Sequence, residues 1–399
     1  MAKITGILLF TLLLLGACSK PVLLSLEEQA AALEAMEYQA QAIKASMNDK
    51  TAENFLAAYD EYYDIKISKV EKAMEYLEKA VKSNLSRNEL IHLVKIAETA
   101  QDEKQLLDIL KELFTRFPDS KLDRRLLKIY FPNAYLLEPE IVEKYVDLKV
   151  FVPVEQLECY YALALGFAEK GEAQQAEAYL SKALDLYNEL AAQGPQRNTL
   201  HHVRDAGLKS FIEYKLGNVD TARDILSQTK KKFTDEYSQV QIALFEKRLE
   251  IMGNEARPIE YQFWINSDNP MDFSALKGKV VLIHFFTWNC DACNTALPLI
   301  KGLEKQIKRD DFVILGATQY TGDKSFTELR EYSYLKDHYL KKRGITWPVC
   351  LTRNDGMDDY GISSYPVYIL IDKQGNVVDG YYISNFAYLQ NRIIGLLEK

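Results

Sequence analysis

The spacing of apolar and polar residues divides the chain into two parts. Over residues 25–252, apolar residues recur at steps of three and four, as in Leu33, Met36 and Ala40, and glycines are sparse. This spacing gathers apolar side chains on one face of a helix, and the abundant Ala, Leu, Glu and Lys favour helix. Residues 253–399 contain short, continuous apolar runs, which are typical of buried strands. The pattern predicts a helical region followed by a separable α/β domain.

The helical region contains a degenerate repeat with offsets of five, nine and twelve residues from its first position. Four segments carry it: Gly171, Ala176, Leu180 and Ala183; Gly217, Ala222, Leu226 and Thr229; Gln101, Leu106, Leu110 and Leu113; and Ser68, Ala73, Leu77 and Ala80. This pattern resembles the tetratricopeptide repeat, in which a residue at an inter-helix turn is followed by a position where helices cross closely and then by a larger apolar residue. The resemblance implies helical hairpins that bind a peptide or protein partner on a concave face, or that serve as a spacer and dimerisation arm.

Tyrosine is abundant in the chain, and Tyr59, Tyr62 and Tyr63 lie close together in the helical region. Tyrosine is enriched in protein interfaces. A tyrosine stripe on a helix is more often ordinary packing, and that is how we interpret these three residues.

One apolar run leads directly into a pair of cysteines. Residues 280–286 read as a buried strand, Cys290 and Cys293 follow, and 294–308 reads as a helix with Pro298 inside it. This order places Cys290 at a helix N-terminus, where unpaired N–H groups and the helix dipole favour a thiolate. Two intervening residues allow a disulfide to close within one helical turn. The segment is predicted to cycle between dithiol and disulfide.

Three elements of the C-terminal third together carry a resemblance to a known family. They are Leu-Lys-Gly-Lys-Val-Val at 276–281, the Cys-x-x-Cys, and Tyr365-Pro366 before a strand that ends in Ile-Asp-x-x-Gly at 371–375. They resemble the TlpA/ResA-like branch of the thioredoxin superfamily, over about residues 255–399. The resemblance implies a thioredoxin-like α/β domain, preceded by a β-hairpin within 258–273.

The resemblance also implies roles for individual residues. Cys290 is expected to attack and Cys293 to resolve the mixed disulfide. Pro366 is expected to be cis and to face the two sulfurs, because a retained cis X-Pro bond usually has a structural task. Tyr365 and Trp288 are expected to contact the extended chain of the substrate.

The sequence departs from the family at three places. Asn289 occupies the position of the usual Trp, Asp291 and Ala292 separate the cysteines, and Ala296 replaces a Glu of ResA-like members. An acidic residue beside Cys290 opposes the thiolate through like-charge repulsion. The redox potential and the direction of electron flow are therefore left open by the sequence.

His284 lies six residues before Cys290, where thioredoxins carry a buried acid. Its ordinary pKa of about 6.5 suits a group that takes the proton from Cys293 during resolution. The alternative is a core histidine bonded to backbone, since a buried imidazole needs partners for its nitrogens.

The N-terminus predicts a lipoprotein. Residues 1–17 have the shape of a signal peptide, with Lys3 before a short apolar run, and Leu-Gly-Ala-Cys ending at Cys18 resembles a bacterial lipobox. Lipid on Cys18 and a tether over 18–24 then place the chain in the bacterial cell envelope, facing the periplasm, and Ser19 favours the outer membrane. An uncleaved anchor helix is the alternative, although the run is short for a membrane span.

The remaining composition narrows the chemistry. The net charge of −8 and the pI near 5.4 argue against a nucleic-acid binder. Cys159 and Cys350 are interpreted as small core residues. Asn294 after Cys293 excludes the Cys-x-x-Cys-His of covalent haem, and no second Cys-x-x-Cys is present for zinc. No metal or cofactor is predicted.

The sequence therefore predicts a thiol–disulfide oxidoreductase that acts on protein thiols and disulfides, with an electron donor that it does not encode. Two alternatives stay open. Thr287, three residues before Cys290, resembles the peroxiredoxin arrangement, although Ile283 replaces that family's Pro. A non-enzymatic scaffold with a passive thioredoxin-like module is the other, and the two adjacent thiols argue against it.

Overall fold

The structure is a computed structural model, and it describes residues 24–47, 52–80, 84–145, 147–192, 199–267, 273–322, 327–352, 357–380 and 385–399. The predicted signal peptide and the lipidation site at Cys18 lie outside these residues. None of the described helices combines the length and the apolar character that crossing a bilayer demands.

The first part of the chain is helical, as the apolar spacing predicts. Its helices are α2 (Leu26–Ser46), α3 (Ala52–Lys79), α4 (Arg87–Ala100), α5 (Glu103–Arg116), α6 (Arg124–Ala134), α7 (Pro139–Tyr145), α8 (Pro153–Glu169), α9 (Ala173–Ala192), α10 (Thr199–Lys215), α11 (Val219–Lys232) and α12 (Glu236–Ile251). Local signals set several of their ends. For example, α2 begins with a capping box in which Ser25 and Glu28 bond each other's backbone N–H groups.

The repeat offsets correspond to turns in three of the four segments. Gly171 lies between α8 and α9, Gly217 between α10 and α11, and Gln101 between α4 and α5, and all three have positive φ. A left-handed residue of this kind commonly ends a helix. The fourth segment is a wrong prediction, because Ser68 lies inside α3 and not at a turn. The helix α3, of 28 residues, continues through this position without a turn.

The second part is built on a six-stranded sheet with the strand order β1-β4-β3-β2-β5-β6. Its strands are β1 (Phe263–Ile265), β2 (Val280–Phe286), β3 (Phe312–Gln319), β4 (Val349–Thr352), β5 (Val367–Ile371) and β6 (Val377–Gly380). Its helices are α13 (Asp291–Gln306), α14 (Glu328–Ser333), α15 (Leu340–Lys342) and α16 (Phe386–Leu397), with a π-helical turn over Tyr334–Tyr339.

The central strands β2, β3 and β4 are parallel, and β5 runs antiparallel to β2. Every residue of β2 is buried, which explains its continuous apolar run. The hairpin expected within 258–273 is wrong for the described residues: β1 pairs antiparallel with β4, with Trp264 opposite Cys350. The alternating residues of this segment therefore extend the edge of the sheet.

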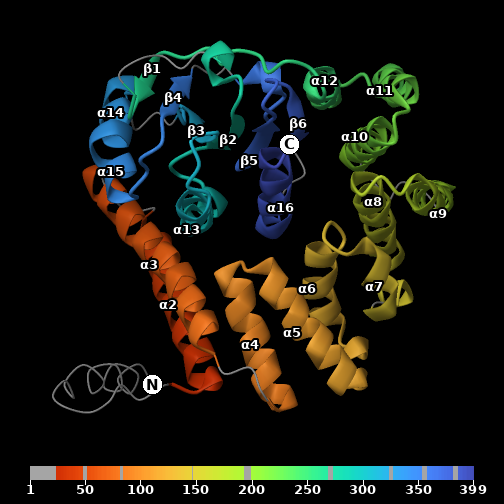
Figure 1. Cartoon of the computed structure of the whole chain (residues 1–399), viewed down its shortest axis with the longest axis horizontal. Helices are drawn as coiled ribbons and strands as arrows, with labels where there is room; N and C mark the ends of the chain where they lie inside the picture. The colour runs from red at the N-terminus through yellow and green to blue at the C-terminus, as the bar shows by residue number, and fades with distance from the viewer. Residues whose placement is uncertain are drawn as a thin grey trace.

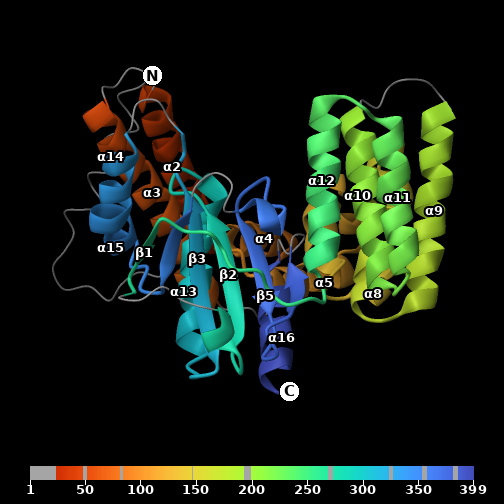
Figure 2. The same cartoon turned by 90° about the horizontal axis from the view of Figure 1, so that it is seen from above.

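The helical region curves around the α/β domain (Figure 1). Figures 1 and 2 both place α2 and α3 on the side of α14 and α15, and α8 to α12 on the side of β5. One continuous cluster of buried apolar side chains extends from Ala30 in α2 to Leu397 in α16. The two parts are thus in contact, with α3 against α13, α12 against the turn at Asp358–Tyr360, and α5 against α16.

A buried polar network joins the two parts on the β6 side. The Oη atom of Tyr388 lies 2.9 Å from the carboxylates of both Asp379 and Glu169. Lys215 approaches Glu169 at 2.7 Å, and Arg392 donates to Asp379 at 2.8 Å. Each buried charge has an opposite charge beside it, which buried ions require.

Candidate active site

A disulfide between Cys290 and Cys293 stands at the start of α13. Cys290 is the N-cap residue, and its Sγ accepts a hydrogen bond from the backbone N–H of Cys293 at 3.1 Å. The helix N-terminus predicted for Cys290 is confirmed. Cys290 is half-buried, whereas Cys293 is fully buried, so an external group can approach only the first sulfur.

The loop before β5 faces this disulfide. The Tyr365–Pro366 peptide bond is cis, and the Tyr365 carbonyl oxygen lies 3.6 Å from Sγ of Cys290. The structure therefore brings together the cysteines and the Tyr-Pro pair, which are separated by more than seventy residues. Burial raises the pKa of Tyr365 to about 12, so its hydroxyl remains a neutral donor, here to Met357 Sδ.

Trp288 is covered by other side chains in this structure. It is 2% exposed, and its Nε1 donates to Glu331 at 2.7 Å. The rings of Tyr59 and Tyr334 meet it edge-on, at centroid distances of 5.5 and 5.2 Å. Contact between Trp288 and a substrate requires movement of these neighbours, and the substrate-binding role of Trp288 stays a prediction.

His284 lies within β2 with aromatic neighbours on its face of the sheet. Its ring stacks on Phe286 and Tyr368, and neither ring nitrogen has a hydrogen-bond partner. The expected bond to backbone is therefore absent for this described residue, and so is a bond to either sulfur. Burial lowers the pKa of His284 to about 3, which keeps the ring neutral. Its role in proton transfer stays a prediction.

Asn294 organises the turn that carries the cysteines, a role that the sequence reasoning missed. Its Nδ2 donates to the carbonyl oxygens of Trp288 and Cys290 at 2.8 and 2.9 Å. Its Oδ1 accepts from Tyr339 at 3.1 Å. Asn294 is fully buried, so these bonds satisfy a side chain that would otherwise be costly to bury. The signal for this role in the sequence is a polar residue at a helix position that is buried.

Asp291, the first of the two residues between the cysteines, is bound by the helical region. Oδ2 of Asp291 accepts from Lys44 of α2 at 2.9 Å and from Tyr62 of α3 at 2.8 Å. Sequence reasoning missed both contacts and interpreted Tyr59 and Tyr62 as ordinary packing. The tyrosine cluster was the only local signal.

Two aspartates of α3 fix it to the α/β domain beside the site. Asp60 accepts from Tyr334 at 2.9 Å and lies 2.5 Å from Nε2 of His338. Asp64 pairs with Arg343, whose side chain is almost fully buried. Burial alone raises the pKa of Asp64, but bonds from Lys342 and Arg343 outweigh it and hold the pKa below its usual value.

The other described cysteines take no part in the site. Cys159 and Cys350 are buried and unpaired, and burial raises the pKa of each thiol to about 12. The interpretation of both as core residues agrees with this burial. Among the described residues, no group of three or more His, Cys, Asp or Glu side chains is arranged to hold a metal ion.

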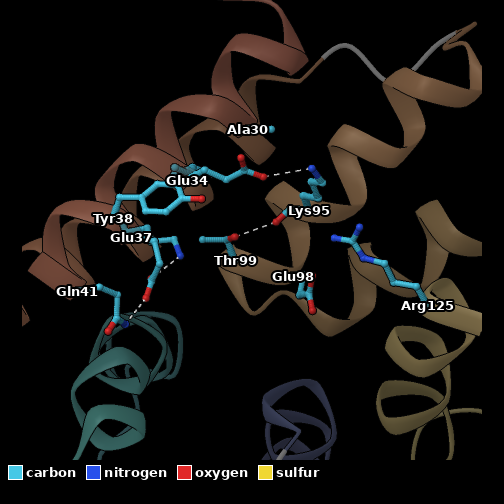
Figure 3. Close-up of a pocket in the computed structure, with 11 residues that line it drawn as sticks. Ala30, Glu34, Glu37, Tyr38, Gln41, Lys95, Glu98, Thr99 and Arg125 are labelled. Carbon is cyan, nitrogen blue, oxygen red and sulfur yellow. Dashed lines mark hydrogen bonds and ion pairs between the residues drawn. The ribbon is translucent and has the colours of Figure 1, made fainter. Parts of the chain in front are cut away.

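Two hollows lie between helices in the described part of the chain. One, of about 480 Å³, is lined by charged residues of both signs from α2, α3, α4 and α6 (Figure 3). There Lys95 pairs with Glu34, and Gln41 donates to Glu37. A larger one, of about 950 Å³, is lined by residues of α5, α13 and α16.

Comparisons with known proteins find sequence relatives for part of the chain. A segment of 122 residues is 30% identical to the chloroplastic protein SUPPRESSOR OF QUENCHING 1 of Arabidopsis thaliana, covering 29% of this chain and 10% of that protein. Another match is 28% identical over 110 residues to the thiol-disulfide oxidoreductase ResA of Bacillus subtilis, covering 27% of this chain and 55% of ResA. About a third of the chain has a thioredoxin-like fold.

Among solved structures, a thiol-disulfide isomerase from Corynebacterium glutamicum is 21% identical, with a TM-score of 0.32. It covers 36% of this chain and 96% of that chain. No protein-family model matches the chain. The matched segments span no more than about half the length of the two curated relatives, and each covers less than a third of this chain.

Proposed function

We propose that the protein is a thiol–disulfide oxidoreductase that exchanges disulfides with partner proteins through Cys290 and Cys293. The observation that carries the proposal is the disulfide at the start of α13, with one half-buried sulfur beside the cis-proline loop. The name of the relative ResA, a thiol-disulfide oxidoreductase, supports it.

The exchange proceeds in two displacements. In the reducing direction, the Cys290 thiolate attacks a disulfide of the partner, an intermolecular disulfide forms, and one partner sulfur leaves as a thiolate. Cys293 then attacks Cys290, which closes the Cys290–Cys293 disulfide and releases the second partner thiol. The Tyr365 carbonyl beside Cys290 is placed to accept a backbone N–H of the partner's extended chain. A separate dithiol donor must reduce the pair again.

The anchoring and location belong to the same proposal. Lipid on Cys18, after removal of residues 1–17, would hold the protein in the bacterial cell envelope on the periplasmic side, at the outer membrane. Helical hairpins of the tetratricopeptide kind in 25–252 would bind a peptide or protein partner on their concave face. A Cys18→Ala variant tests the anchor: labelling by a palmitate analogue should disappear and the unprocessed chain should accumulate.

The experiment that tests the activity is capture of mixed disulfides by a Cys293→Ala variant in the host. Captured proteins should be released by dithiothreitol, and a Cys290→Ser, Cys293→Ala double variant should capture none. Consumption of hydrogen peroxide by the wild type, without transfer to protein disulfides, would favour a peroxidase and contradict the proposal.

A further inference from the structure

The hairpin formed by α2 and α3 reaches Asp291, one of the two residues that separate the cysteines. Lys44 and Tyr62 both bond Oδ2 of Asp291, across 247 and 229 positions of sequence. Both belong to the helical region and lie outside the thioredoxin-like part of the chain. The redox motif is therefore completed by side chains that a minimal thioredoxin-like domain of this chain does not contain.

The charge of Asp291 matters because the residue follows Cys290 directly. A carboxylate at that position opposes a neighbouring thiolate. Burial raises the pKa of Asp291, but the bonds from Lys44 and Tyr62 outweigh this effect and lower it below its usual value. Asp291 is thus ionised, and the ammonium group of Lys44 compensates its charge.

The two partners of Asp291 hold each other in place. The Lys44 ammonium lies 5.3 Å from the centroid of the Tyr62 ring, a cation–π arrangement. The Tyr62 ring is 1% exposed and meets Tyr63 edge-on at 5.0 Å. Burial, then the bond to Asp291, raises the pKa of Tyr62, so its hydroxyl stays protonated and donates. A buried donor and a half-exposed cation therefore converge on one carboxylate oxygen.

We propose that Lys44 and Tyr62 are positioning residues of the redox site, which compensate the charge of Asp291 and so favour the reduced form of the cysteine pair. The inference rests on the proposed thiol–disulfide exchange. When a dithiol donor reduces the site, the Cys290–Cys293 bond breaks and the donor's disulfide forms. The two donor protons pass to the cysteines or, where Cys290 remains a thiolate, one passes to solvent. Lys44 stabilises that thiolate and leaves the neutral disulfide unaffected.

The test uses the full-length protein equilibrated with reduced and oxidised dithiothreitol at pH 7, followed by alkylation to trap the thiols. For Lys44→Met, we expect the equilibrium to move roughly threefold to tenfold toward the disulfide, equivalent to a potential about 14 to 30 mV more negative. The pH midpoint of Cys290 alkylation should rise. Tyr62→Phe should act in the same direction with a smaller effect. Unchanged equilibrium and alkylation midpoint in Lys44→Met would overturn the proposal.

A double-variant comparison separates this effect from a general change of charge. In an Asp291→Asn background, Lys44→Met should move the equilibrium by less than about twofold, because no carboxylate then holds the Lys44 ammonium beside the cysteine pair. Lys95→Met is the matched control. It removes the same charge from a lysine that pairs with Glu34 and not with Asp291. Equal shifts from Lys44→Met in both backgrounds would overturn the proposal. Absence of exchange between dithiothreitol and the wild-type pair would instead contradict the proposed function.

Discussion

Arg248 Nε donates a hydrogen bond of 2.9 Å to the carbonyl oxygen of Gly361. Arg248 belongs to α12, the last helix of the helical region, and its guanidinium also reaches Ser363 Oγ at 3.1 Å. The segment that it binds leads directly to Tyr365 and Pro366. The helical region thus holds the redox site at two places: α3 lies against Asp291, and α12 lies against the approach to the cis-proline loop.

Gly361 allows the second of these contacts. Its φ is +62°, and a Cβ atom there would lie 2.6 Å from the carbonyl oxygen of Leu244 in α12. We predict that Gly361→Ala lowers the free energy of unfolding by at least about 1–2 kcal/mol, since a left-handed backbone and a close approach are both penalised. Denaturant unfolding measures this effect. Gly395→Ala is the control, because nothing lies within 4 Å of that helical position; equal losses would contradict the prediction.

The two cysteines should differ in reactivity. Cys290 is half-buried and Cys293 is fully buried, so iodoacetamide should modify Cys290 faster in the reduced protein at neutral pH. Cys290→Ser should abolish reduction of insulin disulfides, while Cys159→Ser retains it because Cys159 is an unpaired core residue. Equal alkylation rates of Cys290 and Cys293 would contradict the assignment of attacking and resolving thiols.

His284 should make stability depend on pH. Its pKa is about 3 when folded and about 6.5 when unfolded, so the unfolded chain binds more protons between these values. The contribution of the neutral ring to the free energy of unfolding is fully present above pH 6.5. It is lost as the pH falls, by about 2 kcal/mol between pH 7 and pH 5. In His284→Phe this loss should be smaller by that amount. Identical pH dependence of unfolding in both proteins would contradict the low pKa.

The same variant tests proton transfer. His284→Phe removes two buried nitrogens that have no partner and keeps an aromatic ring between Phe286 and Tyr368. With a pKa of about 3 the ring is a weak proton acceptor, so we expect resolution by Cys293 to be unchanged from pH 5 to 8. Release of the mixed disulfide is the measurement. A slower release with unchanged initial attack would establish the proton-accepting role.

A fragment of residues 254–399 tests whether the two parts are separable. The shift in sequence pattern predicts that it folds and retains generic reductase activity. The structure adds contacts that the fragment loses, including the carboxylate of Glu103, which accepts from the N–H groups of Phe386 and Ala387 at the start of α16. We expect it to fold with a free energy of unfolding lower by more than about 1 kcal/mol, because a lost helix cap alone costs that much. An unfolded fragment would show that the parts form one folding unit.

The local features of the site follow from the sequence, and the long-range ones do not. The apolar run of β2, the helix after Cys290 and the turn at Pro366 each depend on a few adjacent residues, so their patterns predict them. Asp291 meets Tyr62 only because α3 packs beside α13, and no local pattern sets that packing. The mistaken turn at Ser68 has the related cause that small residues also occur inside helices at close crossings.

The helix α2 has a further consequence for the proposed lipid anchor. It begins at Leu26, soon after Cys18, and Lys44 near its far end touches the redox motif. Seven extended tether residues span at most about 24 Å, and a helix of 21 residues is about 30 Å long. The disulfide would then work within roughly 55 Å of the bilayer surface. Lipidation of Cys18 would thus set an upper limit on the height of the disulfide above the membrane, and partners would be selected by whether their own cysteines come within that limit.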